Sequence, residues 1–440
     1  MSLDVFRGLV MLLLIPDVYG GFSFYAMANH DPNNPLWSFL ARQFTHAQWS
    51  GCRIWDLVMP SFAFMVGVAI PYSYSARTRA GEPEAAIFTH AAVRALALLM
   101  LGIALMLSVR TVADVLWPFL LLAVGLPIPA LVTKRLRIST VRGKYAIEVA
   151  WWAGILGASG LRLFLRFPEL KGFALHDILP QVGLGYVWAF IMIRYRVVTQ
   201  GLVAFGILFA YWLAFLIYPL PGPGFDAAAV GVSPGDEVFT GYFAHWNKGT
   251  NLAAAFDRWF LNLFPTAESF RFNPHGYQTL NFIPTIVTMI FGLMAGQYLL
   301  SDRPRERIRN GLLGAGGLAV VGGLVLGWVA CPIVKSIWTP SWTIFSAGMA
   351  LTALGFLYHV IDVRGSRVWT FPFMVAGRNP LLLYTLALYY RWWIVEAWRR
   401  AFGPPLFTGY LGLLLEAVAC GFSLWLLAFV LYRLKLFIRI

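Results

Sequence analysis

Apolar residues fill long runs of this chain, and short polar segments separate them. A membrane-spanning helix needs about 20 predominantly apolar residues, and about twelve runs reach that length. They lie near residues 5–27, 54–76, 87–108, 113–133, 145–166, 177–195, 200–219, 280–300, 311–330, 342–362, 372–391 and 409–432. The runs at 113–133 and 145–166 are the weakest, because prolines interrupt the first. The pattern predicts an all-α fold, a polytopic membrane helix bundle of about twelve transmembrane helices, or about ten without that pair.

The distribution of Lys and Arg predicts how the helices are oriented, because short cytoplasmic loops are enriched in these residues. With the N-terminus inside, the cytoplasmic loops are 77–86, 134–144, 194–199, 301–310 and 363–371. Together with Arg7 and the C-terminal tail they hold about 19 Lys and Arg, against about 11 in the much longer opposite loops. We therefore expect both termini to be cytoplasmic.

Two segments on the outer face, 28–53 and 220–279, are longer than a connection requires. Loops beyond about 15 residues are usually functional or disordered. The aromatic residues at 256–264 favour order, in an amphipathic helix against the mouth of the bundle. The inverted-repeat signature of many transporters is missing. We interpret 1–440 as a single transmembrane domain in which 111–167 is a possible two-helix insertion.

Composition agrees with a membrane protein. Hydrophobic residues make up 59% of the chain and charged residues 12%, with a mean hydropathy of +0.69, whereas soluble domains carry about 25% charged residues. The formal charge of +14 lies in short loops between apolar spans, which argues against a nucleic-acid partner. Three widely spaced cysteines exclude a disulfide scaffold, although a single Cys52–Cys331 bridge stays open. The opening residues lack a basic n-region, which predicts no cleavable signal peptide.

Ionisable residues inside spans are costly, so each is a candidate functional residue. Asp4 and Arg7 open the first span on one helical face; a helix cap plus an interface anchor is the alternative reading. Asp17 follows Pro16 within a long apolar run. A functional role for Asp17 competes with a structural ion pair or a water-facing helix end.

The outer segment Thr45–Arg53 contains His46, and Asp56 begins the second span. A histidine with an unperturbed pKa of about 6.5 suits proton transfer, and a carboxylate can orient its imidazole. Taken alone, this spacing is more typical of a structural histidine. Motifs for zinc proteases, phosphate-binding loops and nucleophile elbows do not occur. We therefore expect no metal, no nucleotide hydrolysis and no hydrolase triad.

The segment Gly377–Pro380 interrupts an otherwise apolar span. Its proline frees a backbone carbonyl, and Asn379 can bond freed backbone groups or a ligand. Arg378 lies toward the predicted cytoplasmic half. It either holds an anionic group such as a phosphate of a cytosolic cofactor or snorkels to the interface.

Several motifs resemble those of the heparan-α-glucosaminide N-acetyltransferase family. Ser2-Leu3-Asp4-Val5-Phe6-Arg7-Gly8 is similar to the family's opening motif. His46-Ala47-Gln48-Trp49-Ser50-Gly51, followed by Asp56-Leu57-Val58-Met59-Pro60, is similar to its most specific signature. Weaker matches follow in order at Asn281–Thr285, Trp338–Ser341 and Gly377–Pro380, so the resemblance covers nearly the whole chain.

The resemblance implies a membrane acyltransferase that takes an acetyl group from cytosolic acetyl-CoA and passes it to an amino sugar on the far side. His46 matches the family's catalytic histidine, as general base or as acetyl carrier, and Asp56 and Asp17 are its expected catalytic partners. The remaining motif residues are expected to bind the substrate or acetyl-CoA: Asp4, Arg7, Trp49, Arg53, Asn281, Arg378 and Asn379.

The sequence departs from the family pattern at one catalytic position. The family usually has an asparagine ten residues beyond Gly8, where this chain has Val18, with Asp17 one position earlier. A shift of one residue rotates a side chain by about 100° around a helix. With the possible insertion, this departure indicates a divergent bacterial branch, close to the DUF5009-like proteins.

Three functions remain open on the sequence. The first is a transmembrane acyltransferase of the bacterial inner membrane, acting on an amino sugar or another envelope glycan. It predicts a cavity that joins His46, Asp56 and Asp17 to a cytoplasmic opening. The second is a catalytically lapsed subunit or assembly factor of a larger membrane complex, and the third is a secondary transporter. Membrane lipid is an expected partner, and a homodimer or a larger complex stays open.

Overall fold

The computed structural model describes residues 1–17, 22–106, 174–264, 266–409 and 411–437, with scattered residues between 132 and 165. Within these ranges the fold is helical and has no strand. The two weakest predicted spans, the possible insertion at 111–167 and Val18 lie outside the continuously described ranges.

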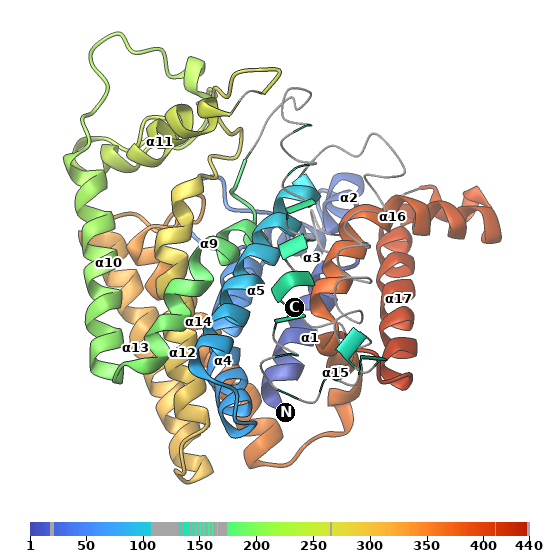
Figure 1. Ribbon diagram of the computed structural model, residues 1–440. Helices are drawn as coiled ribbons and strands as arrows, with labels where there is room; N and C mark the ends of the chain where they lie inside the picture. The colour runs from blue at the N-terminus through green and yellow to red at the C-terminus, as the bar shows by residue number, and fades with distance from the viewer. Residues whose placement is uncertain are drawn as a thin grey trace.

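The principal helices run largely up and down in one bundle (Figure 1). They are α1 (Ser2–Leu14), α4 (Val58–Arg79), α5 (Glu84–Met106), α9 (Ile178–Ile191), α10 (Val197–Ile217), α12 (Phe282–Leu299), α13 (Arg305–Val329), α14 (Pro340–Tyr358), α15 (Phe371–Arg378), α16 (Pro380–Phe402) and α17 (Gly412–Arg433). Shorter α-helices are α2 (Phe24–His30), α3 (Pro35–Gln43) and α11 (Leu252–Phe260). Single turns are η1 (Ile54–Leu57), η3 (Met192–Arg194), η4 (Ala228–Val230), η5 (Gly241–Trp246), η6 (Leu261–Leu263), η7 (Thr279–Asn281), η8 (His359–Val363), η9 (Val368–Thr370) and η10 (Pro404–Phe407).

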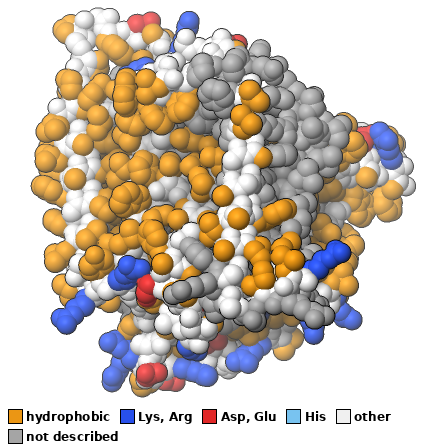
Figure 2. Space-filling model, in the orientation of Figure 1, with side chains coloured by type: hydrophobic (Ala, Val, Ile, Leu, Met, Phe, Trp, Pro, Cys, Tyr) orange, Lys and Arg blue, Asp and Glu red, His pale blue; other side chains and the backbone are white. Residues whose placement is uncertain are grey.

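Seven helices of the described residues are long and apolar enough to cross a membrane. They are Ile54–Arg79, Glu84–Ile103, Val197–Ile217, Thr279–Leu299, Arg305–Val329, Pro340–Val363 and Gly412–Arg433. The chain is therefore a polytopic helical membrane protein, as the hydropathy pattern predicts. On α10 the outward side chains are apolar and exposed, among them Leu202, Phe205 and Ile217. Figure 2 shows this apolar face at the left, with Lys and Arg gathered along the lower edge.

Two predicted spans are divided into shorter helices. The run at 5–27 becomes α1 and α2, and α1 ends at Leu14, two residues before Pro16. The run at 372–391 becomes α15 and α16, and the break is at Asn379, whose φ and ψ are −130° and 49°. The helical region is disfavoured for a residue that precedes proline, so Pro380 explains this break.

The two long outer segments meet at one end of the bundle, which we call the loop end. The indole of Trp49 donates to the backbone oxygen of Trp246 (3.0 Å), and Ser50 donates to Glu237 (2.7 Å). The helix expected near 256–264 begins earlier, as α11, which lies across the top of the bundle in Figure 1.

The opposite end, which we call the N-terminal end, gathers most of the basic segments predicted to be cytoplasmic. Arg194 pairs with Glu84 (2.8 Å), and Arg305 donates to the backbone oxygen of Asp362 (3.0 Å). The amino terminus lies 3.8 Å from the Asp362 carboxylate. The basic segments therefore lie at the end opposite the two long outer segments, as the charge distribution predicts. Which end faces the cytosol stays a prediction.

Backbone contact between α4 and α12 fixes the helix that carries the signature residues. A Cβ added to Gly67 would lie 2.0 Å from the backbone oxygen of Met289, and one added to Gly292 would lie 2.1 Å from that of Phe64. Only glycine allows helices to approach this closely. These two positions therefore set the place of α4 in the bundle.

Candidate functional site

Three ionisable side chains meet at the loop end, beside the start of α4. The Nδ1 atom of His46 lies 2.8 Å from Oδ1 of Asp56. The ammonium of Lys335 lies 2.9 Å from the same Nδ1 and 3.3 Å from the same Oδ1. Asp56 and Lys335 are almost fully buried, whereas the His46 side chain is 45% exposed. We call this group the His46 cluster.

The local fold of the loop before α4 places Asp56. Its second oxygen, Oδ2, accepts from the backbone nitrogens of Ala47 (3.1 Å) and Arg53 (3.0 Å). The Arg53 guanidinium in turn donates to Thr45 Oγ1 (2.7 Å) and to the backbone oxygen of His46 (2.9 Å). One carboxylate thus closes the loop with Oδ2 and faces the imidazole with Oδ1.

The contact with Asp56 determines the tautomer of His46. A carboxylate only accepts hydrogen bonds, so Nδ1 must carry the proton and the lone pair is on Nε2. Burial lowers the pKa of His46 below its ordinary value; the hydrogen bond to Asp56 acts in the opposite direction, and the charge of Lys335 lowers it further. The imidazole is therefore held neutral near pH 7, with a basic Nε2.

Aromatic side chains form one wall of the cluster. The Tyr277 ring stands edge-on to His46 (6.3 Å between centroids), and the Lys335 ammonium lies 5.5 Å from its centroid. His176 stacks on Tyr277 at 5.9 Å. An aromatic wall beside a basic nitrogen suits the binding of a sugar ring or an acyl chain.

Two residues of the predicted set fix loops in place. Trp49 is 3% exposed, packs against Gly276 and donates to Trp246, so it joins the two outer segments. Asn281 is fully buried and donates to the backbone oxygen of Ser336 (2.9 Å), the neighbour of Lys335. Both therefore position the His46 cluster from below the surface.

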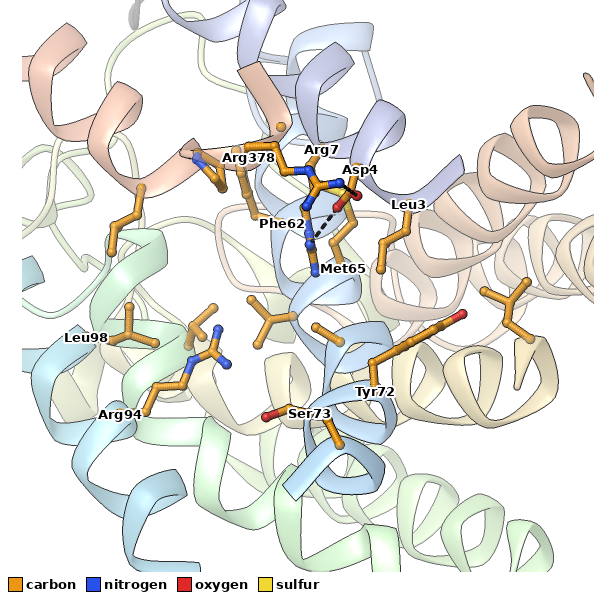
Figure 3. A pocket seen from close by; sticks show the side chains of 18 of the residues that line it. Leu3, Asp4, Arg7, Phe62, Met65, Tyr72, Ser73, Arg94, Leu98 and Arg378 are labelled. Carbon is orange, nitrogen blue, oxygen red and sulfur yellow. Dashed lines mark hydrogen bonds and ion pairs between the residues drawn. The ribbon is translucent and has the colours of Figure 1, made fainter. Parts of the chain in front are cut away.

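A cavity of about 1060 Å³ lies at the N-terminal end of the bundle. It is about as large as the upper range of small-molecule sites, about 300–1,000 Å³. Figure 3 shows Asp4 between Arg7 and Arg378 on one wall, and Arg94 of α5 on the facing wall. Its lining also includes Phe62 and Met65 of α4, and Ile178 and Leu179 of α9.

Four arginines line the cavity against three carboxylates, those of Asp4, Glu82 and Asp362, so its charge is slightly positive. Asp4 lies 3.4 Å from Arg7 and 3.5 Å from Arg378, and Arg77 also lines the space. Within the described part of the chain, the buried Nε atoms of Arg94 and Arg378 have no hydrogen-bond partner. Guanidinium groups that keep an unpartnered Nε fit the phosphates of a coenzyme A molecule.

The cavity and the His46 cluster are separate regions that approach one another. The lining of this cavity does not contain His46, Asp56 or Asp17, so a cavity that joins these three residues stays a prediction. Short stretches of chain connect the two regions. Phe62 is six residues beyond Asp56, a rise of about 10 Å, and Ile178 is two residues beyond His176.

Two further predicted residues lie apart from the cluster. Asp17 is buried, accepts from Ser23 Oγ (2.8 Å) and lies 3.8 Å from the Arg391 guanidinium, which is the structural ion pair left open on the sequence. Asn379 is fully buried beside Arg378 and donates to the backbone oxygen of Leu436 (3.1 Å).

Sequence reasoning missed Lys335 and Arg94. Arg94 had a signal, because it is an ionisable residue inside the predicted span 87–108. Lys335 had only a weak one, as a lone lysine between two spans. Within the described ranges the three cysteines are free, and no group of three or more His, Cys, Asp or Glu is arranged to hold a metal ion.

These features define a class: a polytopic helical membrane protein with a histidine–carboxylate–lysine cluster at one end and an arginine-lined cavity toward the other. Two curated proteins are similar over nearly the whole chain. Heparan-alpha-glucosaminide N-acetyltransferase of Mus musculus is 25% identical over 459 residues, covering 99% of this chain. That of Homo sapiens is 25% identical over 472 residues, covering all of it.

The chain spans 60% and 59% of the lengths of these two relatives. No family model matches the chain. The matches over nearly the whole of this chain confirm the resemblance carried by the motifs: the chain is distantly similar to heparan-alpha-glucosaminide N-acetyltransferases.

Proposed function

We propose that the protein is a transmembrane acyltransferase. Acetyl-CoA would bind from the cytosol at the N-terminal end, and an amino sugar or another envelope glycan would accept the acetyl group at the loop end. The membrane would be the inner membrane of a bacterium, with both chain termini in the cytosol. The distant relationship to proteins named as N-acetyltransferases supports acyl transfer as the type of reaction.

One observation carries the proposal. The same helical segment, Ile54–Arg79, holds Asp56 of the His46 cluster at its start and lines the arginine-rich cavity farther along. A donor with an anionic nucleotide and a long thioester arm suits this arrangement. Arg94, Arg378 and Arg7 would hold its phosphates, and the apolar surfaces of Phe62 and Ile178 would guide the arm toward His46.

The neutral His46 suits either of two routes. As a general base, Nε2 takes the proton of the acceptor amine or hydroxyl while the acceptor oxygen or nitrogen attacks the thioester carbonyl. The carbon–sulfur bond breaks, and His46 returns the proton to the thiolate. As an acetyl carrier, Nε2 itself attacks the carbonyl and the thiolate leaves; the acceptor then takes the acetyl group from the imidazole, and the proton that the acceptor loses goes to the thiolate.

The test is acetyl-CoA binding and acetyl transfer by the protein purified in lipid nanodiscs. We expect saturable binding by wild type and by His46→Ala, and transfer to glucosamine by wild type alone. His30→Ala is the matched control, an exposed histidine of the same outer segment, and it should retain both activities. Absence of binding at millimolar acetyl-CoA by folded protein would refute the proposal, and co-purifying partner chains would then favour a lapsed subunit.

A further inference from the structure

The position of Lys335 is the least expected feature of the His46 cluster. It comes from the segment between α13 and α14, 289 residues from His46 in the chain. Its side chain is only 8% exposed. A buried lysine is costly unless it is paired, and here its partner is the same Oδ1 atom that accepts from the imidazole.

The distances around Nδ1 restrict what Lys335 can do. Nδ1 cannot donate to Asp56 and accept from Lys335 at the same time, because a neutral nitrogen either carries the proton or the lone pair. The shorter contact, 2.8 Å to Asp56, assigns the proton to Nδ1. The ammonium then bonds to Oδ1 and lies against the imidazole as a neighbouring positive charge.

This charge opposes the usual effect of a carboxylate on histidine. A lone carboxylate within hydrogen-bond distance stabilises imidazolium and raises its pKa, commonly by 1–3 units. With Lys335 present, Asp56 is already neutralised, and a second proton on His46 would place two cations about 3 Å apart. The other groups near the ring do not offset this: His275 and the Arg53 guanidinium are basic, and Tyr277 is neutral.

We propose that Lys335 is a positioning residue that holds His46 unprotonated, with its lone pair on Nε2, by neutralising Asp56 from the side of Nδ1. Asp56 then orients the imidazole without converting it to imidazolium. The inference rests on the proposed function for its purpose, since a base or acetyl carrier must be unprotonated before it acts. The predicted consequence is that the site stays competent at pH values well below 7.

The experiment measures the protonation of His46 directly, without requiring acetyl transfer. Diethyl pyrocarbonate modifies only unprotonated imidazole, so its rate of reaction against pH gives the midpoint of titration. Cleavage by trypsin after Arg42 and Arg53 releases residues 43–53, a peptide with His46 as its single histidine. Exposed His30 is the internal reference, and the protein is used full-length in nanodiscs.

For wild type we expect a midpoint below the ordinary histidine value of about 6.5. In Lys335→Met the midpoint should rise by about 1 unit or more, a change of about tenfold in proton affinity. Lys335→Arg keeps the charge and should stay near wild type. Lys248→Met removes another lysine at the loop end, 13% exposed and paired with Asp236 instead, and should leave the midpoint unchanged.

A Lys335→Met midpoint equal to that of wild type, in protein whose helical circular dichroism and thermal midpoint show that it is folded, would overturn the proposal. Should Lys335→Met not fold, the wild-type titration decides, because a midpoint at or above about 6.5 also overturns it. If wild type transfers acetyl groups, the acidic limb of the pH profile of transfer should move to higher pH in Lys335→Met, together with the His46 midpoint. If wild type shows no acetyl transfer but the His46 midpoint still rises in Lys335→Met, the proposed function is contradicted. The role of Lys335 then stands.

Discussion

Replacing Asp56 by asparagine separates the catalytic and structural roles of the His46 cluster. Asparagine keeps the size of the side chain and can leave its oxygen where Oδ2 accepts from Ala47 and Arg53. Its amide nitrogen then faces Nδ1 of His46. Because that nitrogen donates, Nδ1 must accept, and the proton moves to Nε2, where it blocks both the base and the acetyl carrier.

The magnitudes follow from the burial of the pair. Asp56 is 1% exposed and Lys335 8%, and removing one partner of a buried ion pair costs about 3–5 kcal/mol. The wrong tautomer should reduce transfer by about two to four orders of magnitude. The double variant Asp56→Asn/Lys335→Met removes the unpaired ammonium and should recover about 2 kcal/mol, without recovering transfer.

The assay combines unfolding in mixed micelles titrated with dodecyl sulfate and acetyl transfer measured on the same preparations. Asp236→Asn is the control, since the Asp236 carboxylate is 28% exposed and pairs with Lys248; it should cost about 1 kcal/mol or less. If Asp56→Asn is as stable as wild type, or if the double variant recovers acetyl transfer, the pairing in the His46 cluster is not as described.

Three other predictions follow from the cavity, the helix packing and the outer segment. Arg94→Gln should weaken acetyl-CoA binding by about tenfold or more and reduce its salt dependence. The control Arg303→Gln removes a guanidinium stacked on Tyr298 and should leave binding unchanged. Isothermal titration calorimetry with acetyl-CoA measures the affinity of both variants. Gly67→Leu should prevent folding or lower the thermal midpoint strongly, because its Cβ would meet the Met289 carbonyl at 2.0 Å; a midpoint like that of wild type would contradict this packing. Burial raises the pKa of Asp257 to about 6, above its unfolded value of about 3.9, so its contribution to stability is full below about pH 4 and is lost as pH rises through about 6. Stability relative to Asp257→Asn should therefore fall between about pH 4 and pH 6 and level off above that, and a pH-independent difference would show that Asp257 stays ionised.

The sequence predicts the helical membrane class because hydropathy is a local property. Each span needs only its own apolar residues, so its place can be read from one window of the chain. The same holds for the break at Asn379, because Pro380 acts on the residue before it. The pairing of His46 with Asp56 was also within reach of sequence, since the two residues lie only ten positions apart.

Tertiary structure decided what depends on contacts between distant segments. Lys335 reaches His46 only because α12 and α14 pack beside α4, and the helix contacts that permit this are set by glycines whose role is invisible before packing. The arginine-rich cavity likewise draws Asp4, Arg94 and Arg378 from three different helices. Sequence therefore determined the helical membrane class and brought His46 and Asp56 together, but it did not identify Lys335 or Arg94. Packing alone decided which charges meet, because the interaction between charges depends on distance in space and not on separation along the chain.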